Sequence, residues 1–128
     1  MENAKGKPNA MKSLSLSASL VLIASAVTAE PWALRAADAV LSEEEIATDV
    51  IGQRLVFYDN GESRFSPGGS YSYTYFQGGT AYGTYRLVEP GVICIDFRNG
   101  FGRCDKYVRN GANLVILTES GERYPVRP

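Results

Sequence analysis

The sequence predicts a mainly β (α+β) fold: an antiparallel meander or small barrel of about six to eight short strands, with one short amino-terminal helix packed on it. Three observations support this prediction. The spacing of apolar residues changes from a helical period to a strand period after Gly52. Turn-forming residues then separate short β-rich runs at intervals of about 8 to 12 residues, which is typical of an antiparallel sheet. Finally, the two cysteines fall opposite each other in a predicted hairpin.

Residues 1–29 have the layout of a secretory signal peptide. Lys5, Lys7 and Lys12 give a basic start, residues 14–27 are apolar with small residues interspersed, and small side chains precede Glu30. The alternative is a transmembrane anchor, which needs roughly 20 apolar residues to span a bilayer. This apolar core has only 14 residues. We therefore expect a periplasmic or secreted protein without a membrane span after cleavage.

The rest of the chain predicts a flexible lead-in at residues 30–40 and a single disulfide-stapled β domain at residues 41–128. From Glu30 onward the chain carries 10 Arg and Lys against 13 Asp and Glu. A nucleic-acid-binding protein normally shows a clustered basic face, and none is visible here, so nucleic acid is not an expected partner. A domain of this size leaves much apolar surface exposed, and a covalent staple helps it hold one structure.

The helix is predicted over residues 43–51. Ser42 and Glu45 form a capping box, three glutamates favour the positive end of the helix dipole, and Gly52 supplies the stop. A helix this short is not stable alone, so its apolar stripe must pack on the sheet. The predicted strands that follow are residues 54–58, 63–65, 71–76, 81–88, the two cysteine-bearing strands within 92–108, residues 114–117 and a short strand near Tyr124.

The two cysteines lie in a predicted hairpin that turns at Arg98-Asn99-Gly100. This loop pairs Phe97 with Phe101 and puts Cys94 opposite Cys104. Directly opposed residues of an antiparallel pair have Cβ atoms about 4.5 to 5.5 Å apart, which is near enough for a disulfide after a modest adjustment. Two cysteines in an exported chain are best interpreted as paired.

The alternation of this hairpin leaves both faces apolar. Ile93, Ile95, Phe97 and Phe101 share the face that we assign to the core. The opposite face carries Val92, Cys94, Cys104 and Val108, and either the helix or the amino-terminal segment can cover it. We expect the helix there.

The chain has no histidine, which excludes the usual hydrolase triads, histidine zinc sites and histidine-ligated haem. Both methionines lie in the leader and no C-x-x-C motif is present, so no metal or cofactor is expected. Carboxylates remain as candidates in principle: Glu89, Asp96, Asp105 and Glu119. Asp96 and Asp105 fall on opposite faces of the hairpin, and Asp105 beside Arg103 and Lys106 reads as a surface charge pattern. We therefore predict no catalytic residues and no enzyme activity.

Tyrosines recur along two neighbouring predicted strands. Alternation places Tyr71, Tyr73 and Tyr75 on one face. Tyr82 and Tyr85 are three residues apart, so both join that face only if a bulge near Gly83 shifts the alternation. Such a flat aromatic surface can bind a sugar ring, an apolar ligand or a partner protein. Alternatively, the tyrosines simply cover one side of a thin core.

The order of short motifs resembles a group of small exported proteobacterial proteins whose function is uncharacterised. The motifs are L-S-x-x-E-I at Leu41, G-x-x-L-x-F at Gly52, F-S-P-G-G-S-Y at Phe65, Gly83-Thr84-Tyr85, Ile93-Cys94 and a second cysteine. The group usually has Asp at Gly68 and Trp at Tyr85. The resemblance implies an exported domain with a helix followed by a β-meander, and it brings no catalytic residues.

These features together predict a small exported module that binds a protein or glycan of the cell envelope without catalysis. An inhibitor of a hydrolase is a sharper version of this hypothesis. The alternatives are a structural cell-envelope protein and a carboxylate-dependent enzyme.

Overall fold

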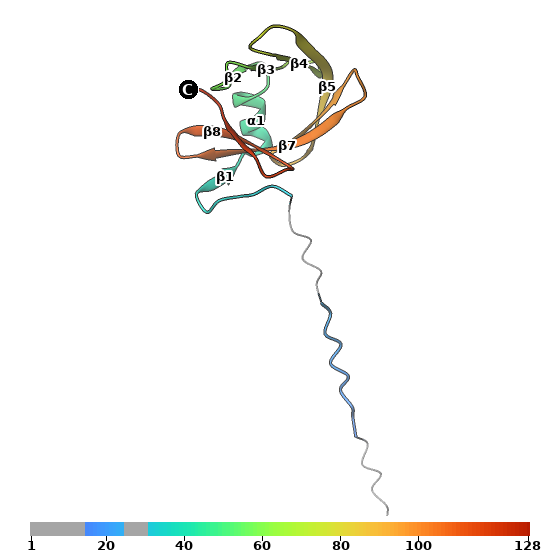
Figure 1. Cartoon of the computed structure of the whole chain (residues 1–128). Helices are drawn as coiled ribbons and strands as arrows, with labels where there is room; N and C mark the ends of the chain where they lie inside the picture. The colour runs from blue at the N-terminus through green and yellow to red at the C-terminus, as the bar shows by residue number, and fades with distance from the viewer. Residues whose placement is uncertain (1–14, 25–30) are drawn as a thin grey trace, which may run out of the picture.

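The computed structural model describes residues 15–24 and 31–128, and among these it shows a mainly β protein (Figure 1). Eight strands form an antiparallel meander that curls into a half-barrel, with one short helix, as the sequence predicted. Each strand from β2 to β8 pairs with the next one along the chain, and β1 pairs with β7. The strands are β1 Asp38–Val40, β2 Arg54–Val56, β3 Glu62–Phe65, β4 Ser70–Thr74, β5 Thr80–Glu89, β6 Val92–Phe97, β7 Gly102–Asn110, β8 Asn113–Thr118 and β9 Arg123–Pro125.

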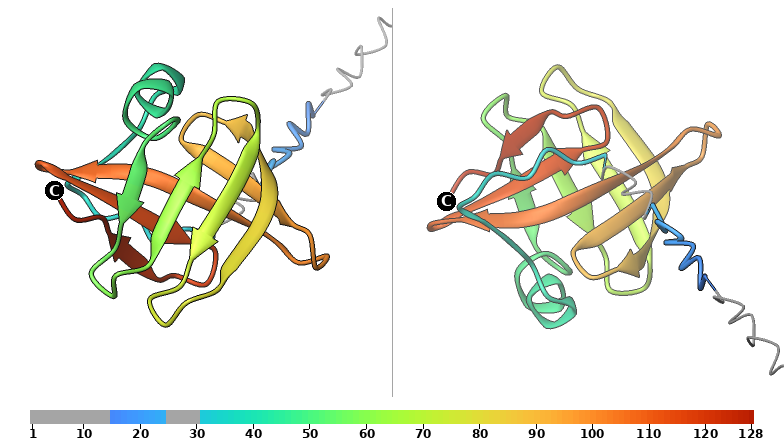
Figure 2. Two further views of the ribbon diagram at one scale, coloured as in Figure 1. Left: turned by 90° about the horizontal axis from the view of Figure 1, so that it is seen from above. Right: turned by 90° about the horizontal axis from the view of Figure 1, so that it is seen from below.

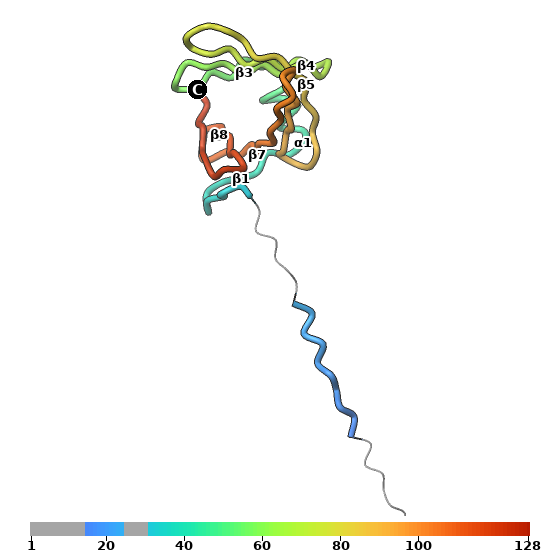
Figure 3. Tube along the Cα trace, turned by 45° about the vertical axis from the view of Figure 1, so that its right-hand side comes forward, coloured from blue at the N-terminus to red at the C-terminus, as the bar shows by residue number. Residues whose placement is uncertain are grey.

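The curl brings the two ends of the meander together. Phe57 and Val126 form an antiparallel bridge, and the Arg127 amide donates to the Val56 carbonyl at 2.8 Å. The tube in Figure 3 accordingly traces a ring of strands. Because strand side chains alternate, every second residue points into this ring, where the main core lies. That core includes Phe65, Tyr71, Ile93, Ile95, Tyr107 and Ile116.

Helix α1, Glu43–Asp49, covers one end of the ring (Figure 2). Its capping box forms as predicted: the Ser42 hydroxyl accepts from the Glu45 amide at 3.1 Å, and the Glu45 carboxylate accepts from the Ser42 amide at 3.2 Å. Ile46 and Val50 are fully buried in the main core. The expectation that the helix covers the cystine face is therefore wrong. Its apolar stripe closes the open barrel end instead, where Ile46 and Val50 join the main core.

The amino-terminal segment covers the outer face of the sheet. Trp32 packs on a second cluster formed by Val108, Val115 and Leu117, and the segment crosses the outer side of β7 and β8 (Figure 2, right). The prediction of a flexible lead-in at 30–40 is corrected by this arrangement, since Asp38–Val40 pair with β7 as strand β1. The outer face of β7 and β8 is apolar and needs cover, and this segment supplies it.

Asp38 anchors that segment. Its carboxylate, whose side chain is fully buried, accepts two hydrogen bonds from the Arg123 guanidinium at 2.7 and 2.9 Å. It also accepts from the Asn110 amide at 2.9 Å and from the Arg35 backbone at 2.8 Å. These four charge-assisted bonds hold the pKa of Asp38 well below its usual value, chiefly through Arg123. The carboxylate thus ties β1 to the far strand β9.

The cysteine hairpin forms in the predicted register. Cys94 pairs with Cys104 across β6 and β7, and a disulfide joins them. Gly100 adopts a φ of 92°, the left-handed conformation that the turn requires. Phe101 is an exception to the predicted core face: it is 74% exposed, because it lies at the hairpin tip beyond the curl of the sheet. A disulfide of this kind is typical of proteins in oxidising compartments.

The predicted signal peptide lies largely outside the described residues, which exclude 1–14 and 25–30. Residues 15–24 form no helix or strand, and their leucines are more than 80% exposed. Within the described ranges, no helix combines the length and the apolar character that a membrane crossing requires.

Candidate functional site

The end of the ring opposite α1 holds a pocket of about 220 Å³, which we call the mouth. Four hairpin turns meet at this end, because every second connection of an antiparallel meander lies at the same end (Figure 2). The mouth is lined by Phe57, Asp59, Tyr73, Tyr75, Phe97, Arg103, Asp105, Ile116, Thr118 and Tyr124.

Aromatic rings form the walls of the mouth. Tyr73 and Tyr75 stand edge to face with their ring centroids 5.0 Å apart, and the Phe57 ring lies 6.3 Å from that of Tyr73. Tyr75 is 53% exposed and Tyr124 is 45% exposed, so both present ring surface to solvent. Aromatic side chains of this kind offer large contact area at a small cost in conformational entropy.

Asp105, Arg103 and Asp59 are the charged residues that line the mouth, and the first two are in contact with each other. Both come from β7, two residues apart on its inner face, and Nε of Arg103 lies 2.9 Å from Oδ2 of Asp105. The Asp105 side chain is 1% exposed, whereas that of Arg103 is 46% exposed. The Arg103 N–H is not directed at the carboxylate, however. Neither oxygen of Asp105 accepts a hydrogen bond from any residue in the described part of the chain.

A buried carboxylate without hydrogen bonds is unusual, since most buried polar side-chain atoms have a partner. Burial raises the pKa of Asp105 above its usual value, while the nearby Arg103 guanidinium opposes that rise. The same carboxylate, together with neighbouring tyrosines, raises the pKa of Arg103 against the effect of its own burial. Asp105 therefore keeps acceptor capacity, above all at Oδ1, although both oxygens are buried and Oδ2 lies 2.9 Å from the Arg103 guanidinium.

The five predicted tyrosines do not form one flat surface. Tyr73 and Tyr75 line the mouth, but Tyr71 is only 2% exposed, and its hydroxyl shares a 2.8 Å hydrogen bond with Ser63. Tyr85 packs inside against Phe65 and donates to the Ser66 carbonyl at 2.6 Å.

Tyr82 lies on the opposite face from these rings. It pairs with Ser72 in an unbroken register, and its ring faces the Arg98 guanidinium at 5.2 Å. The register shift in β5 falls between Leu87 and Glu89 instead of near Gly83. The five tyrosines therefore do not form the flat aromatic surface, because the curl of the sheet buries Tyr71 and partly buries Tyr85 in the core.

The four candidate carboxylates do not converge. Asp96 is exposed and lies 3.8 Å from Arg86 on the outer face, while Asp105 faces inward, as their predicted separation requires. Glu119 accepts from the Cys104 amide at 3.2 Å. The interpretation of Asp105 as a surface charge is wrong. The predicted register could have shown this, because it pairs Asp105 with Ile93, which we had assigned to the core face.

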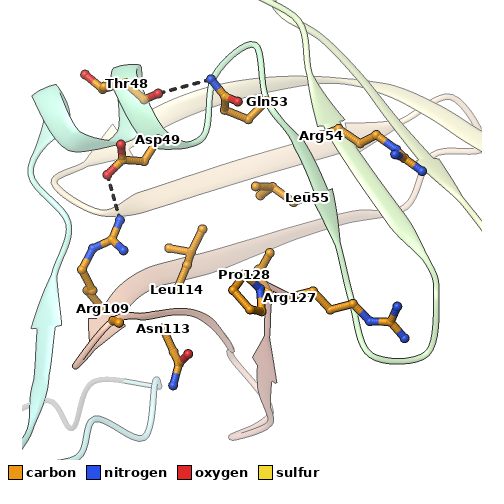
Figure 4. Close-up of a pocket in the computed structure, with 12 residues that line it drawn as sticks. Thr48, Asp49, Gln53, Arg54, Leu55, Arg109, Asn113, Leu114, Arg127 and Pro128 are labelled. Atoms are coloured by element: carbon orange, nitrogen blue, oxygen red, sulfur yellow. Dashed lines mark hydrogen bonds and ion pairs between the residues drawn. The ribbon is translucent and has the colours of Figure 1, made fainter.

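A second pocket, of about 410 Å³, lies beside α1 at the other end of the ring (Figure 4). Its charged groups already have partners. Arg109 donates to Asp49 at 2.8 Å, and Arg54 forms an ion pair with Glu62. Arg127 donates to the Tyr58 carbonyl at 3.3 Å. This pocket is larger than the mouth, but none of its lining residues has a buried polar side-chain atom without a hydrogen bond. The mouth is therefore the stronger candidate.

In the part of the chain that the structure describes, no group of three His, Cys, Asp or Glu side chains is placed to hold a metal ion.

Comparison with protein-family models, with curated proteins and with solved structures gives no match to this chain. The resemblance to the exported proteobacterial group therefore stays a prediction, and the candidate site depends on geometry alone.

Proposed function

We propose that this chain is an exported, non-catalytic binding module of the periplasm or the extracellular space, and that the mouth is its binding site. One observation carries the proposal: a carboxylate with both oxygens free of hydrogen bonds is buried at an aromatic-lined pocket. Pockets that combine apolar walls with a few convergent polar groups are the usual form of ligand sites.

The disulfide supports the exported location, because such bonds persist in oxidising compartments. It also suits a rigid scaffold, since a preorganised site loses less conformational freedom on binding. The predicted signal peptide points the same way. None of these observations depends on the identity of the ligand.

The proposal is tested by screening small ring-bearing compounds of three classes, namely sugars, apolar rings and cationic rings, by ligand-observed NMR. Binding of at least one class should weaken at least tenfold in Tyr75→Ala. It should persist in Tyr82→Ala, a matched control because Tyr82 is 50% exposed but lies outside the mouth. If no compound of any class binds in a Tyr75-dependent way, the mouth is not a ligand site.

A second candidate function is inhibition of a hydrolase through the hairpin tips around the mouth. Phe76 and Phe101 are 69% and 74% exposed, and each lies at a turn on the mouth side of the ring. Exposed aromatic residues are frequent anchors of protein interfaces. Assays against a panel of muramidases and proteases test this version, and the absence of inhibition across the panel contradicts it.

A further inference from the structure

The mouth places hydrogen-bond acceptors directly beside hydrogen-bond donors. A carboxylate accepts through two oxygens, and those of Asp105 accept none from the described residues. A guanidinium carries five N–H donors, and Arg103 approaches Asp105 through Nε at 2.9 Å with its side chain 46% exposed. A ligand that fits this pair must therefore both donate and accept within a few ångströms.

Neighbouring hydroxyl groups on one ring meet this requirement. Each hydroxyl has one donor hydrogen and two acceptor lone pairs, so one can donate to Asp105 while the next accepts from Arg103. The C–H face of a saturated sugar ring can then lie against the Tyr73 and Tyr75 rings, which line the same pocket. Hydrogen bonds to charged groups are the stronger ones, which favours this arrangement.

The size and the charge of the mouth argue against other ligands. Its volume of about 220 Å³ lies below the roughly 300 Å³ at which drug-sized pockets begin, so it has room for one ring. A cationic ligand would meet the Arg103 guanidinium, which lies 2.9 Å from Asp105, and Asp59 is the one further carboxylate among the lining residues. A purely apolar ring would offer the carboxylate no hydrogen-bond donor.

We propose, on the basis of the function proposed above, that the mouth binds a single polyhydroxylated ring, such as the terminal residue of a glycan. The Asp105 carboxylate accepts hydrogen bonds from ring hydroxyls, the Arg103 guanidinium donates to them, and Tyr73 and Tyr75 contact the ring face. Thr118, the cross-strand partner of Asp105, and Tyr124 also line the mouth, but their hydroxyls already bond to Ser120 and Glu122.

The test measures binding of four probes by saturation-transfer NMR. They are N-acetylglucosamine, its β-linked trimer, cyclohexylmethanol and tetramethylammonium chloride. Cyclohexylmethanol matches the ring size without neighbouring hydroxyls, and tetramethylammonium represents a cationic ligand. A monosaccharide should bind with a dissociation constant on the order of 1 mM, as its small number of atoms allows. The trimer should bind more tightly if the natural source is a glycan end, and equally if it is a free sugar.

The decisive variants are Asp105→Asn and Arg103→Gln, which keep approximate size while they remove the charges. Each should weaken sugar binding by about 10- to 100-fold, the loss expected for a hydrogen bond to a charged group. Tyr82→Ala should bind the sugars within about twofold of the unmodified chain, a change of well under 1 kcal/mol. Thermal melting of each variant shows that the loss of binding is not a loss of fold.

Two results overturn this inference. If neither sugar binds, or if both charge variants bind sugars as the unmodified chain does, the mouth does not recognise ring hydroxyls. If cyclohexylmethanol or tetramethylammonium binds in a Tyr75-dependent way while the sugars do not, the sugar assignment fails but the mouth remains a ligand site.

Discussion

Replacing Asp105 by Asn is expected to stabilise the folded chain, which is unusual for a buried charged residue that touches an oppositely charged one. The reason is that burial penalises the charged carboxylate more than a neutral amide of the same size, and neither carboxylate oxygen has a hydrogen bond that offsets this penalty. Leaving a buried polar atom unsatisfied costs about 1 to 3 kcal/mol. The contact with Arg103 returns less, because Arg103 is 46% exposed and pairs that reach solvent contribute about 0 to 1 kcal/mol.

The difference between this cost and the contribution of the Arg103 contact predicts that Asp105→Asn raises the free energy of unfolding by about 1 kcal/mol at pH 7. For a domain of this size the gain raises the melting temperature by roughly 4 to 8 °C. Urea unfolding followed by circular dichroism measures the free energy directly. Asp96→Asn is the matched control, since Asp96 lies on the same hairpin with its side chain 63% exposed, and it should change stability by less than about 0.5 kcal/mol.

The pH dependence has a definite sign. Burial raises the folded-state pKa of Asp105 above its usual value of 3.8, so the folded state binds this proton more tightly than the unfolded state does. The carboxylate therefore destabilises the fold at neutral pH, and that effect fades as the pH falls through the folded pKa. The advantage of Asp105→Asn should shrink accordingly between neutral pH and the acidic range. Arg103, Glu119 and Tyr107 interact electrostatically with Asp105, and these residues are unchanged in the Asp105→Asn variant.

The opposite outcome refutes the reasoning. If Asp105→Asn lowers the free energy of unfolding by more than about 1 kcal/mol at pH 7, the Arg103 contact is a stabilising buried ion pair. Asp105 would then stabilise the fold, and the proposal that its carboxylate binds a ligand would lose its physical basis.

Three further predictions concern the scaffold and its export. Asp38→Asn should lower stability by about 3 kcal/mol, because it breaks a buried, four-donor network. The control is Asp49→Asn, which breaks an ion pair with Arg109 whose two side chains are each about one-third exposed. It should lower the free energy of unfolding by less than about 1 kcal/mol in the same urea experiment. Equal losses in the two variants would contradict the anchoring role of Asp38. Reducing the disulfide should lower the melting temperature by several degrees, as about 2 kcal/mol does in a domain of this size, and an unchanged melt would mean that the bond does not restrain the unfolded chain. Mass spectrometry of the exported chain should find Glu30 at its amino terminus, whereas a retained leader would favour the membrane-anchor alternative.

Local sequence signals predicted the elements of this fold well. The capping box at Ser42 specifies where α1 begins, and the Arg98-Asn99-Gly100 turn fixes the hairpin register that brings Cys94 to Cys104. These features depend on residues that are close in sequence, so the chemistry of a few side chains decides them.

Features that depend on the curl of the sheet were not predicted. Alternation correctly placed Tyr71 and Tyr73 on one face, but it cannot show that this face is the inside of a closed ring. For the same reason the helix was assigned to the wrong apolar surface, and a segment with weak local signals, Asp38–Val40, became a strand through a contact with the distant Arg123. Closure of the ring decides the first two, and long-range contacts with β7 and Arg123 decide the third.

The sequence predicted only part of the candidate site. Tyr73 and Tyr75 were among the predicted binding residues, and both line the mouth. Asp105 was assigned to the surface because its neighbours Arg103 and Lys106 are charged. Its pairing with Ile93 places it inside instead, so strand register was a better guide than local charge.

The most direct test of a sugar-binding mouth is an NMR titration of the chain, carrying ¹³C-labelled tyrosine rings, with the β-linked trimer of N-acetylglucosamine. The ring signals of Tyr73, Tyr75 and Tyr124 should shift together with one dissociation constant, while that of Tyr82 stays in place. Shifts confined to Tyr82, or no shift at any ring while the chain remains folded, would contradict the account.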